Sequence, residues 1–170
     1  MEELPFCHCE TCSDEPRATE DVSLQGRTFR YQFVYGSYPG FSFKGLNNAK
    51  TLAVMRKAMA ELSSVSGAKF TESSKSSDLR FYFMKTVAYN AIGVYMGKGK
   101  VYFNQNRPVT EQIANICTQH ETAHFLGLKA SPASDKFSHC PDSSCIFNIN
   151  GTGPKWCLKC RSQLTSRWGK

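Results

Sequence analysis

Short stretches of the chain alternate apolar with more polar residues. Between residues 28 and 35 an aromatic residue occupies every second position, which is the period of a strand with one buried face. Residues 79–84 alternate in the same way. Two further β-prone runs, 92–96 and 100–103, are joined by Gly97-Lys98-Gly99. A short glycine-rich connection predicts that these two runs form a hairpin.

Two other stretches repeat with the helical period. In the first, Asn47 or Asn48 can cap a helix that runs to about residue 63, and its apolar face holds Leu52, Met55, Met59 and Leu62. The second predicted helix covers residues 109–126 and places the following residues on neighbouring turns: Ile113, Ile116, Cys117, His120 and His124. A Ser/Lys-rich turn follows the first helix and leads into residues 79–84, and the chain beyond Gly127 reads as irregular.

This order of elements predicts an α+β fold, with a mixed twisted sheet, two main helices and an irregular C-terminal segment. The length of 170 residues suits one domain. We divide it into an acidic, cysteine-containing arm (1–26) and a body (27–170) that includes a cysteine-rich segment (140–160).

Charge is distributed unevenly between these two parts. Residues 1–21 carry a net charge of −6, and the remainder carries +13. The arm could lie across the basic body or remain a solvated tail. The basic body would also suit nucleic acid, although its bases are spread along the chain rather than gathered in one stripe.

The sequence shows no feature that directs it to a membrane. No apolar run reaches the roughly 20 residues needed to cross a bilayer, and the first residues lack the basic and apolar regions of a signal peptide. We therefore expect a cytoplasmic protein with no membrane partner and an unknown oligomeric state. In that compartment the eight cysteines are expected to be metal ligands rather than disulfides.

The segment His120-Glu121-Thr122-Ala123-His124 has the spacing of a zinc site. Side chains four residues apart lie on one face of a helix, so His120 and His124 can bind one ion. Glu121 can then take a proton from a metal-bound water instead of binding the metal. Gly127 suits a left-handed helix end that turns the chain back toward the metal.

A third metal ligand should lie after this helix. No glutamate follows Glu121, which excludes the class of zinc peptidases that uses a later glutamate. Asp135, His139 and Asp142 are the candidates. We favour His139 because imidazole is a common zinc ligand, with Asp135 as its main competitor.

Four cysteines follow in two pairs, at positions 140, 145, 157 and 160. Two such pairs suit a tetrahedral zinc ion bound by Cys140, Cys145, Cys157 and Cys160. Because His139 directly precedes Cys140, folding of this structural site should be coupled to assembly of the catalytic one.

Together these motifs resemble the metzincin clan of zinc endopeptidases, and most closely the archaemetzincins. The resemblance covers roughly residues 27–160, and the order of elements is similar to that of the matrixin catalytic domain. Two positions depart from the family pattern. Ala130 stands where the family has its third histidine, and Phe147 stands where it has the Met-turn methionine, so that an apolar floor below the zinc is kept.

The resemblance implies a zinc endopeptidase with one catalytic and one structural zinc ion, in which Glu121 is the general base. It also implies that a peptide or protein substrate pairs with an edge strand, for which we expect residues 92–96, with Gly93 permitting close approach. The alternative is a non-catalytic, zinc-stabilised protein that binds nucleic acid or has a structural role.

An N-terminal cluster and the single residue Cys117 are not part of either predicted zinc site. Cys7, His8, Cys9 and Cys12 could bind another metal, supply an inhibitory thiolate to the catalytic zinc, or form a reactive tail. Cys117 is expected to be a small buried residue of the histidine-bearing helix.

Overall fold

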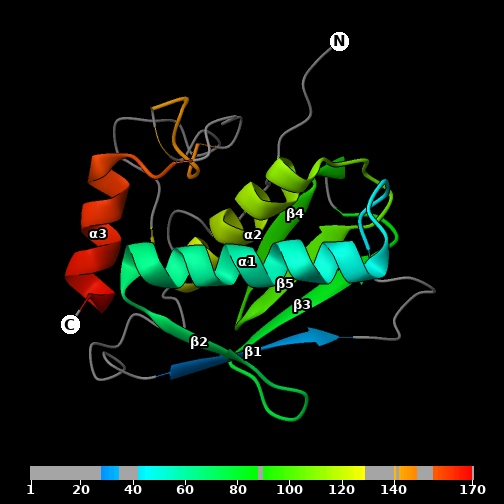
Figure 1. Cartoon of the computed structure of the whole chain (residues 1–170), viewed down its shortest axis with the longest axis horizontal. Coiled ribbons are helices and arrows are strands. Elements are labelled where there is room, and N and C mark those ends of the chain that lie inside the picture. Colours follow the sequence, from blue (N-terminus) through cyan, green and yellow to red (C-terminus); the bar gives the residue numbers. More distant parts are fainter. Residues whose placement is uncertain are drawn as a thin grey trace.

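The computed structural model describes residues 28–34, 42–87, 90–128, 140, 142–148 and 155–169. Within these ranges a mixed five-stranded sheet is combined with three helices (Figure 1). The predicted α+β class is therefore confirmed. The predicted arm, residues 1–26, lies outside the described residues. None of the helices in these ranges has both the length and the apolar character needed to cross a bilayer.

The sheet has the strand order β2-β1-β3-β5-β4. Its strands are β1 (Thr28–Val34), β2 (Lys69–Glu72), β3 (Leu79–Met84), β4 (Gly93–Gly97) and β5 (Lys100–Asn104). Neighbouring strands are parallel except for β4 and β5, which form the predicted antiparallel hairpin. β4 therefore lies at one edge, as expected for residues 92–96.

The other edge strand, β2, was not expected, because residues 69–72 read as part of a turn. That prediction is wrong. β2 pairs in parallel with β1 over four residues, yet most of its side chains are exposed. A strand with so little buried surface leaves almost no hydrophobic alternation in the sequence.

The two long helices begin at side-chain caps. In α1 (Asn48–Ser66), the Asn47 side chain accepts a hydrogen bond from the backbone N–H of Lys50 at 2.8 Å. In α2 (Glu111–Phe125), Thr110 caps in the same way. Both caps satisfy a backbone donor that has no partner within the helix. Gly127, at φ 91°, follows the end of α2 in the left-handed conformation that the sequence suggested.

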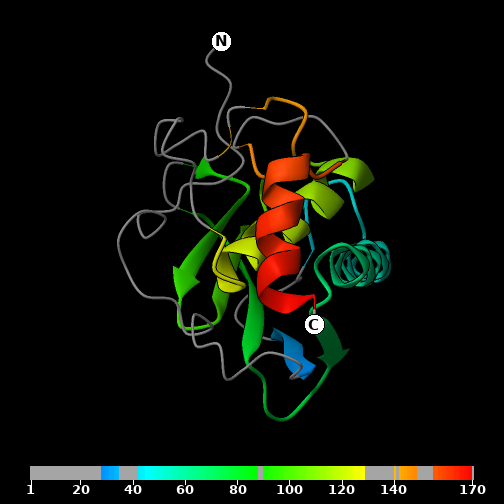
Figure 2. The same ribbon diagram turned by 90° about the vertical axis from the view of Figure 1, so that its left-hand side faces the viewer.

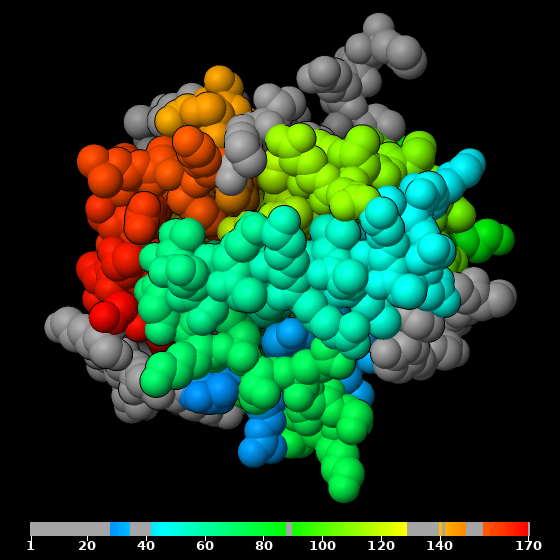
Figure 3. Space-filling view, viewed as in Figure 1, coloured from blue at the N-terminus to red at the C-terminus, as the bar shows by residue number. Residues whose placement is uncertain are grey.

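α1 and α2 pack against each other and cover one face of the sheet (Figures 1 and 2). Figure 3 shows α1 crossing this side of the molecule beside α2. The core between helices and sheet is rich in aromatic rings. Its largest fully buried side chains include Phe29, Phe43, Phe81, Phe103, Phe125, Met55, Met59 and Leu62. This core packs between the sheet and α2, the helix that carries the two histidines, and so fixes the position of α2 relative to the strands.

A third helix, α3 (Leu158–Trp168), occupies part of the segment that was expected to be irregular. That expectation is wrong for these residues. Cys160, Leu164 and Trp168, spaced four apart, are the buried residues of the helix. The indole N–H of Trp168 donates to the carbonyl of Leu126 at 2.9 Å. α3 thus packs against the end of α2 (Figure 2).

Candidate metal centres

α2 brings His120, Glu121 and His124 together below the surface. Their nearest ligand atoms lie within 4.8 Å of one another. The two imidazole rings are 5.0 Å apart between centroids, and all three residues are at most 1% exposed. The helical spacing of four residues therefore has the effect predicted for it, since both rings reach one small volume.

The backbone carbonyl of Ile146 orients His120. Nδ1 of His120 lies 2.8 Å from this carbonyl oxygen, so Nδ1 carries the proton and donates it. The lone pair of the neutral ring is then on Nε2. Burial lowers the pKa of His120 to about 4, and the bond to Ile146 opposes that shift. A neutral imidazole held by a hydrogen bond from its other nitrogen is the form that binds zinc in proteins.

Glu121 lies beside this imidazole. Its Oε1 is 4.0 Å from Nε2 of His120. On the sheet side it is close to β4, where a Cβ added to Gly93 would lie 3.4 Å from Cγ of Glu121. The lack of a side chain at Gly93 therefore lets the edge strand approach the carboxylate for which the sequence predicts the role of general base.

Phe147 packs beneath both histidines. Its ring centroid is 5.1 Å from that of His120 and 4.9 Å from that of His124, and the side chain is fully buried. This is the place where an apolar floor was expected. A ring in contact with both imidazoles limits their rotation.

The third ligand remains a prediction. His139 and Asp135 lie outside the described residues, as do Cys7, His8, Cys9 and Cys12. Asp142 is described, and its carboxylate accepts hydrogen bonds from the N–H and the hydroxyl of Ser144 at 2.9 and 2.6 Å. The described metal-ligating clusters do not include it.

The four cysteines form a second group, separate from the histidines. Their sulfur atoms all lie within 4.8 Å of one another, and those of Cys140 and Cys157 are 3.7 Å apart. A tetrahedral ZnS₄ site with Zn–S bonds of about 2.3 Å has sulfur–sulfur edges of about 3.8 Å. A disulfide would require about 2.05 Å, and all four cysteines are free. The arrangement therefore fits a zinc ion.

Backbone N–H groups and a helix end surround these sulfurs. The sulfur of Cys145 accepts from the N–H of Phe147 at 3.4 Å and of Cys157 at 3.3 Å. Cys157 also caps the N-terminus of α3. Such donors and the positive end of a helix stabilise thiolates. A hydrogen bond from the Cys160 side chain lowers the pKa of Cys145. Burial, in contrast, raises the pKa of Cys140 to about 11.

Cys117 does not belong to either group. It is 2% exposed within α2, and burial raises its pKa above the ordinary value. A buried thiol of this kind stays protonated and unreactive. The expectation of a small buried residue is confirmed.

Two described stretches of the cysteine-rich segment are called knuckle 1 (residues 145–148) and knuckle 2 (residues 155–157). The N–H of Ile146 donates to the carbonyl of Lys155 at 2.9 Å, which joins the knuckles. Asn148 donates to the carbonyl of Cys140 at 2.6 Å. Knuckle 1 also supplies the carbonyl that orients His120. No sequence signal identified Ile146, because its role belongs to the backbone.

The sequence matches no model of a known protein family. It also matches none of the curated proteins with which it was compared. A comparison of structures, however, finds similarity to the crystal structure of myroilysin, with a TM-score of 0.62 and 9% sequence identity. The match covers 99% of this chain and 93% of that chain. This similarity shows a shared fold, and the resemblance to archaemetzincins stays a prediction.

Proposed function

We propose that this protein is a zinc-dependent endopeptidase that acts on peptides or proteins. The observation that carries the proposal is the buried group of His120, Glu121 and His124 on one helix, with His120 held in the tautomer that suits a metal. The fold supports it, since the chain is similar in structure to myroilysin, a metalloprotease. Metzincin membership would account for both features.

His120 and His124 would hold the catalytic ion, with His139 as the proposed third ligand. A zinc ion bound in this way supplies Lewis acidity and lowers the pKa of a coordinated water to about 7. The chain contributes the rest. Ile146 keeps the lone pair of His120 directed away from its carbonyl, and Phe147 restricts both rings.

Glu121 is proposed to move the proton. Its carboxylate would accept a proton from the attacking water as the C–O bond forms, and would then give it to the departing amine as the C–N bond breaks. Burial at 1% exposure keeps bulk water away from this carboxylate. In such surroundings a charge has a stronger effect on a nearby reacting group than it has in water.

The edge strand β4 is the proposed binding place for an extended substrate. Among the described strands, β4 pairs only with β5. A peptide backbone can add to such an edge by main-chain hydrogen bonds. β4 also carries Gly93, which lies next to Glu121, so a bound peptide would pass close to the proposed general base.

The four cysteines are proposed to bind a second, structural zinc ion. Four sulfur ligands in a closed tetrahedron leave no position for a substrate or a reactive water. The role of this ion would be to hold residues 140–160 in place. Knuckle 1 would then be fixed against α2.

The decisive experiment compares wild type with Glu121→Gln and Glu111→Gln. Glu111 is on the same helix, but it is exposed and pairs with Lys50. Cleavage of an unstructured protein and zinc content by elemental analysis are measured for each. We expect Glu121→Gln to lower cleavage by about 100-fold or more at unchanged zinc content, and Glu111→Gln to behave as wild type.

Equal cleavage by wild type and Glu121→Gln would overturn the proposed mechanism. Absence of cleavage by a fully zinc-loaded wild type would favour the non-catalytic alternative. The third ligand is tested separately: we expect His139→Ala to lower the affinity for one zinc ion and Asp135→Ala to leave it unchanged. The opposite pattern would assign the ligand to Asp135.

A further inference from the structure

The two knuckles form hydrogen bonds with two consecutive residues of α2, Gln119 and His120. Knuckle 1 contacts His120 through the carbonyl of Ile146 at 2.8 Å. Knuckle 2 contacts Gln119 through Trp156, whose indole N–H donates to Oε1 of Gln119 at 2.9 Å. Consecutive residues of a helix point about 100° apart. The two contacts therefore hold α2 from two sides.

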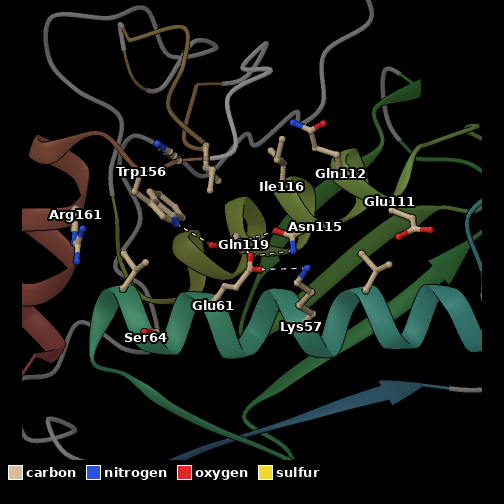
Figure 4. Close-up of a pocket in the computed structure, with 14 residues that line it drawn as sticks. Lys57, Glu61, Ser64, Glu111, Gln112, Asn115, Ile116, Gln119, Trp156 and Arg161 are labelled. Atoms are coloured by element: carbon tan, nitrogen blue, oxygen red, sulfur yellow. Dashed lines mark hydrogen bonds and ion pairs between the residues drawn. The ribbon is translucent and has the colours of Figure 1, made fainter.

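The amide of Gln119 is fixed at both ends. An indole nitrogen can only donate a hydrogen bond, so Oε1 of Gln119 must face Trp156. Nε2 of Gln119 donates to Glu61 of α1 at 3.0 Å, and a carboxylate can only accept. Figure 4 shows this chain of side chains running from α1 across α2 to knuckle 2. Gln119 is 2% exposed, so exchange of these bonds with water is limited.

These side chains belong to a groove of about 680 Å³ between α1, α2 and knuckle 2. Glu61, Gln119, Ile146 and Trp156 all line it. The ring of Phe147 lies roughly parallel to that of Trp156, with 6.4 Å between centroids. The same Phe147 ring also packs against His120 and His124. Both knuckles therefore reach the histidine site through packed side chains.

The cysteine cluster joins the two knuckles and so affects their position relative to each other. Cys145 begins knuckle 1 and Cys157 ends knuckle 2, and the sulfur of Cys145 accepts from the N–H of Cys157 at 3.3 Å. No disulfide joins these four sulfur atoms, whereas an ion bound to all four would add bonds that hold them at this geometry. An ion bound by the four sulfurs would lock the knuckles together.

We propose that the four-cysteine cluster acts as a clamp on α2, so that an ion bound by the cysteines raises the affinity of the histidine site for its own ion. Ile146 and Trp156 are the positioning residues through which it acts. This inference rests on the proposed function only in taking His120 and His124 as metal ligands. It does not require that the protein cleave peptides.

Thermodynamic linkage makes the coupling reciprocal. If an ion at the cysteines strengthens binding at the histidines by some factor, an ion at the histidines must strengthen binding at the cysteines by the same factor. A merely structural role for Trp156 would lower the affinity of the histidine site by the same factor whether or not the cysteines hold an ion. A change in the size of the coupling factor therefore distinguishes a clamp from a general loss of stability.

The test uses the full chain, stripped of metal and then equilibrated with buffered concentrations of free Zn²⁺ or Co²⁺. The absorption of Co²⁺–thiolate charge transfer reports the cysteine site. Total bound metal, measured by elemental analysis, gives the histidine site by difference. Wild type is compared with Trp156→Phe, which removes the indole donor and keeps an aromatic ring, and with Lys155→Ala, a change at the neighbouring exposed residue of the same knuckle.

We expect Trp156→Phe to weaken the histidine site by about two- to tenfold, the effect of one hydrogen bond, and to reduce the reciprocal effect equally. Lys155→Ala should match wild type. The double variant Cys157→Ser/Cys160→Ser should weaken the histidine site by about 10- to 100-fold, as loss of outer contacts to a metal ligand does; circular dichroism checks its folding.

Three results would separate the possible failures. Equal histidine-site affinity in wild type and Trp156→Phe would overturn the clamp and leave the proposed function intact. Loss of histidine-site affinity with an unchanged coupling factor would also overturn it, because the effect would then be structural. Absence of any metal at the histidines of wild type would overturn the proposed function itself and the clamp with it.

Discussion

Gly93 of β4 lies directly against Glu121 of α2. A Cβ at Gly93 would be 3.4 Å from Cγ of Glu121 and 2.9 Å from two ring atoms of Phe103. A contact below 3.0 Å forces one of the neighbours to move. Phe103 is surrounded by other aromatic rings, among them Phe43 and Phe83 at 5.2 and 5.6 Å between centroids. The shift is therefore passed partly to Glu121.

We expect Gly93→Ala to lower stability by about 1–3 kcal/mol, because it overpacks a dense core. It should also lower peptide cleavage per folded molecule, with metal content unchanged, because Glu121 moves. Gly97→Ala in the same strand is the control. Gly97 has φ 82° and its added Cβ meets nothing within 4 Å, so it should lose stability through backbone strain alone. Equal specific activity of both variants would contradict this reading.

Replacing Phe147 tests the floor below the histidines. Phe147→Ala should cost about 3–5 kcal/mol, since it removes a fully buried ring, and it should weaken metal binding at His120 and His124. Phe147→Met, which introduces the residue of the metzincin pattern, should cost less than about 1.5 kcal/mol and keep the metal. Chemical unfolding measures the stability of each variant, and metal titration measures its affinity for the ion. Metal affinity that is unchanged in Phe147→Ala would show that the ring does not restrain the ligands.

Removing metal with a chelator should destabilise the protein strongly. A structural zinc ion contributes several kcal/mol to folding, so we expect the thermal midpoint to fall by about 10 °C or more. Zn²⁺ should restore it and Mg²⁺ should not, because thiolates prefer soft ions. Cys160→Ala should remove most of the response, leaving the part that comes from the histidine site, whereas Cys117→Ala should retain it. A chelator response of full size in Cys160→Ala would exclude the four-cysteine site as its main source.

The metal-free protein should lose stability as the pH falls from about 6.5 to about 4. In this window an unfolded chain protonates His120, whereas the folded chain, with a pKa of about 4, does not. Its contribution is complete above pH 6.5 and is lost as the pH falls through 4, with a size of roughly 3 kcal/mol. Urea unfolding across this range should show a shallower pH slope in His120→Gln. Identical slopes would mean that His120 does not cause the loss.

Much of the fold was predictable because local signals coincide with buried faces. The strand at residues 79–84 has the bounds expected from its alternation, and α1 is capped by Asn47, one of the two asparagines predicted to do so. The helical spacing of His120 and His124 also fixed their juxtaposition. In each case one short stretch of chain contains both the signal and its consequence.

Other features depend on partners distant in sequence. The parallel pairing of β1 with β2 follows from how α1 packs, and the exposed residues of β2 give no sign of it. α3 did carry a signal, since Cys160, Leu164 and Trp168 repeat every four residues. This signal is weak because the surrounding residues are polar and paired cysteines are typical of a loop. The carbonyl of Ile146 could not be predicted at all, since every residue has one.

The position of α2 ahead of both knuckles has a consequence during protein synthesis. A growing chain that has reached residue 128 already contains His120 and His124, but not Ile146, Phe147 or Trp156. Translation proceeds at about 5–20 residues per second, so a few seconds separate the histidines from the parts that orient them. On the proposed function, a nascent polypeptide would therefore remain inert toward its neighbours until both knuckles have left the ribosome.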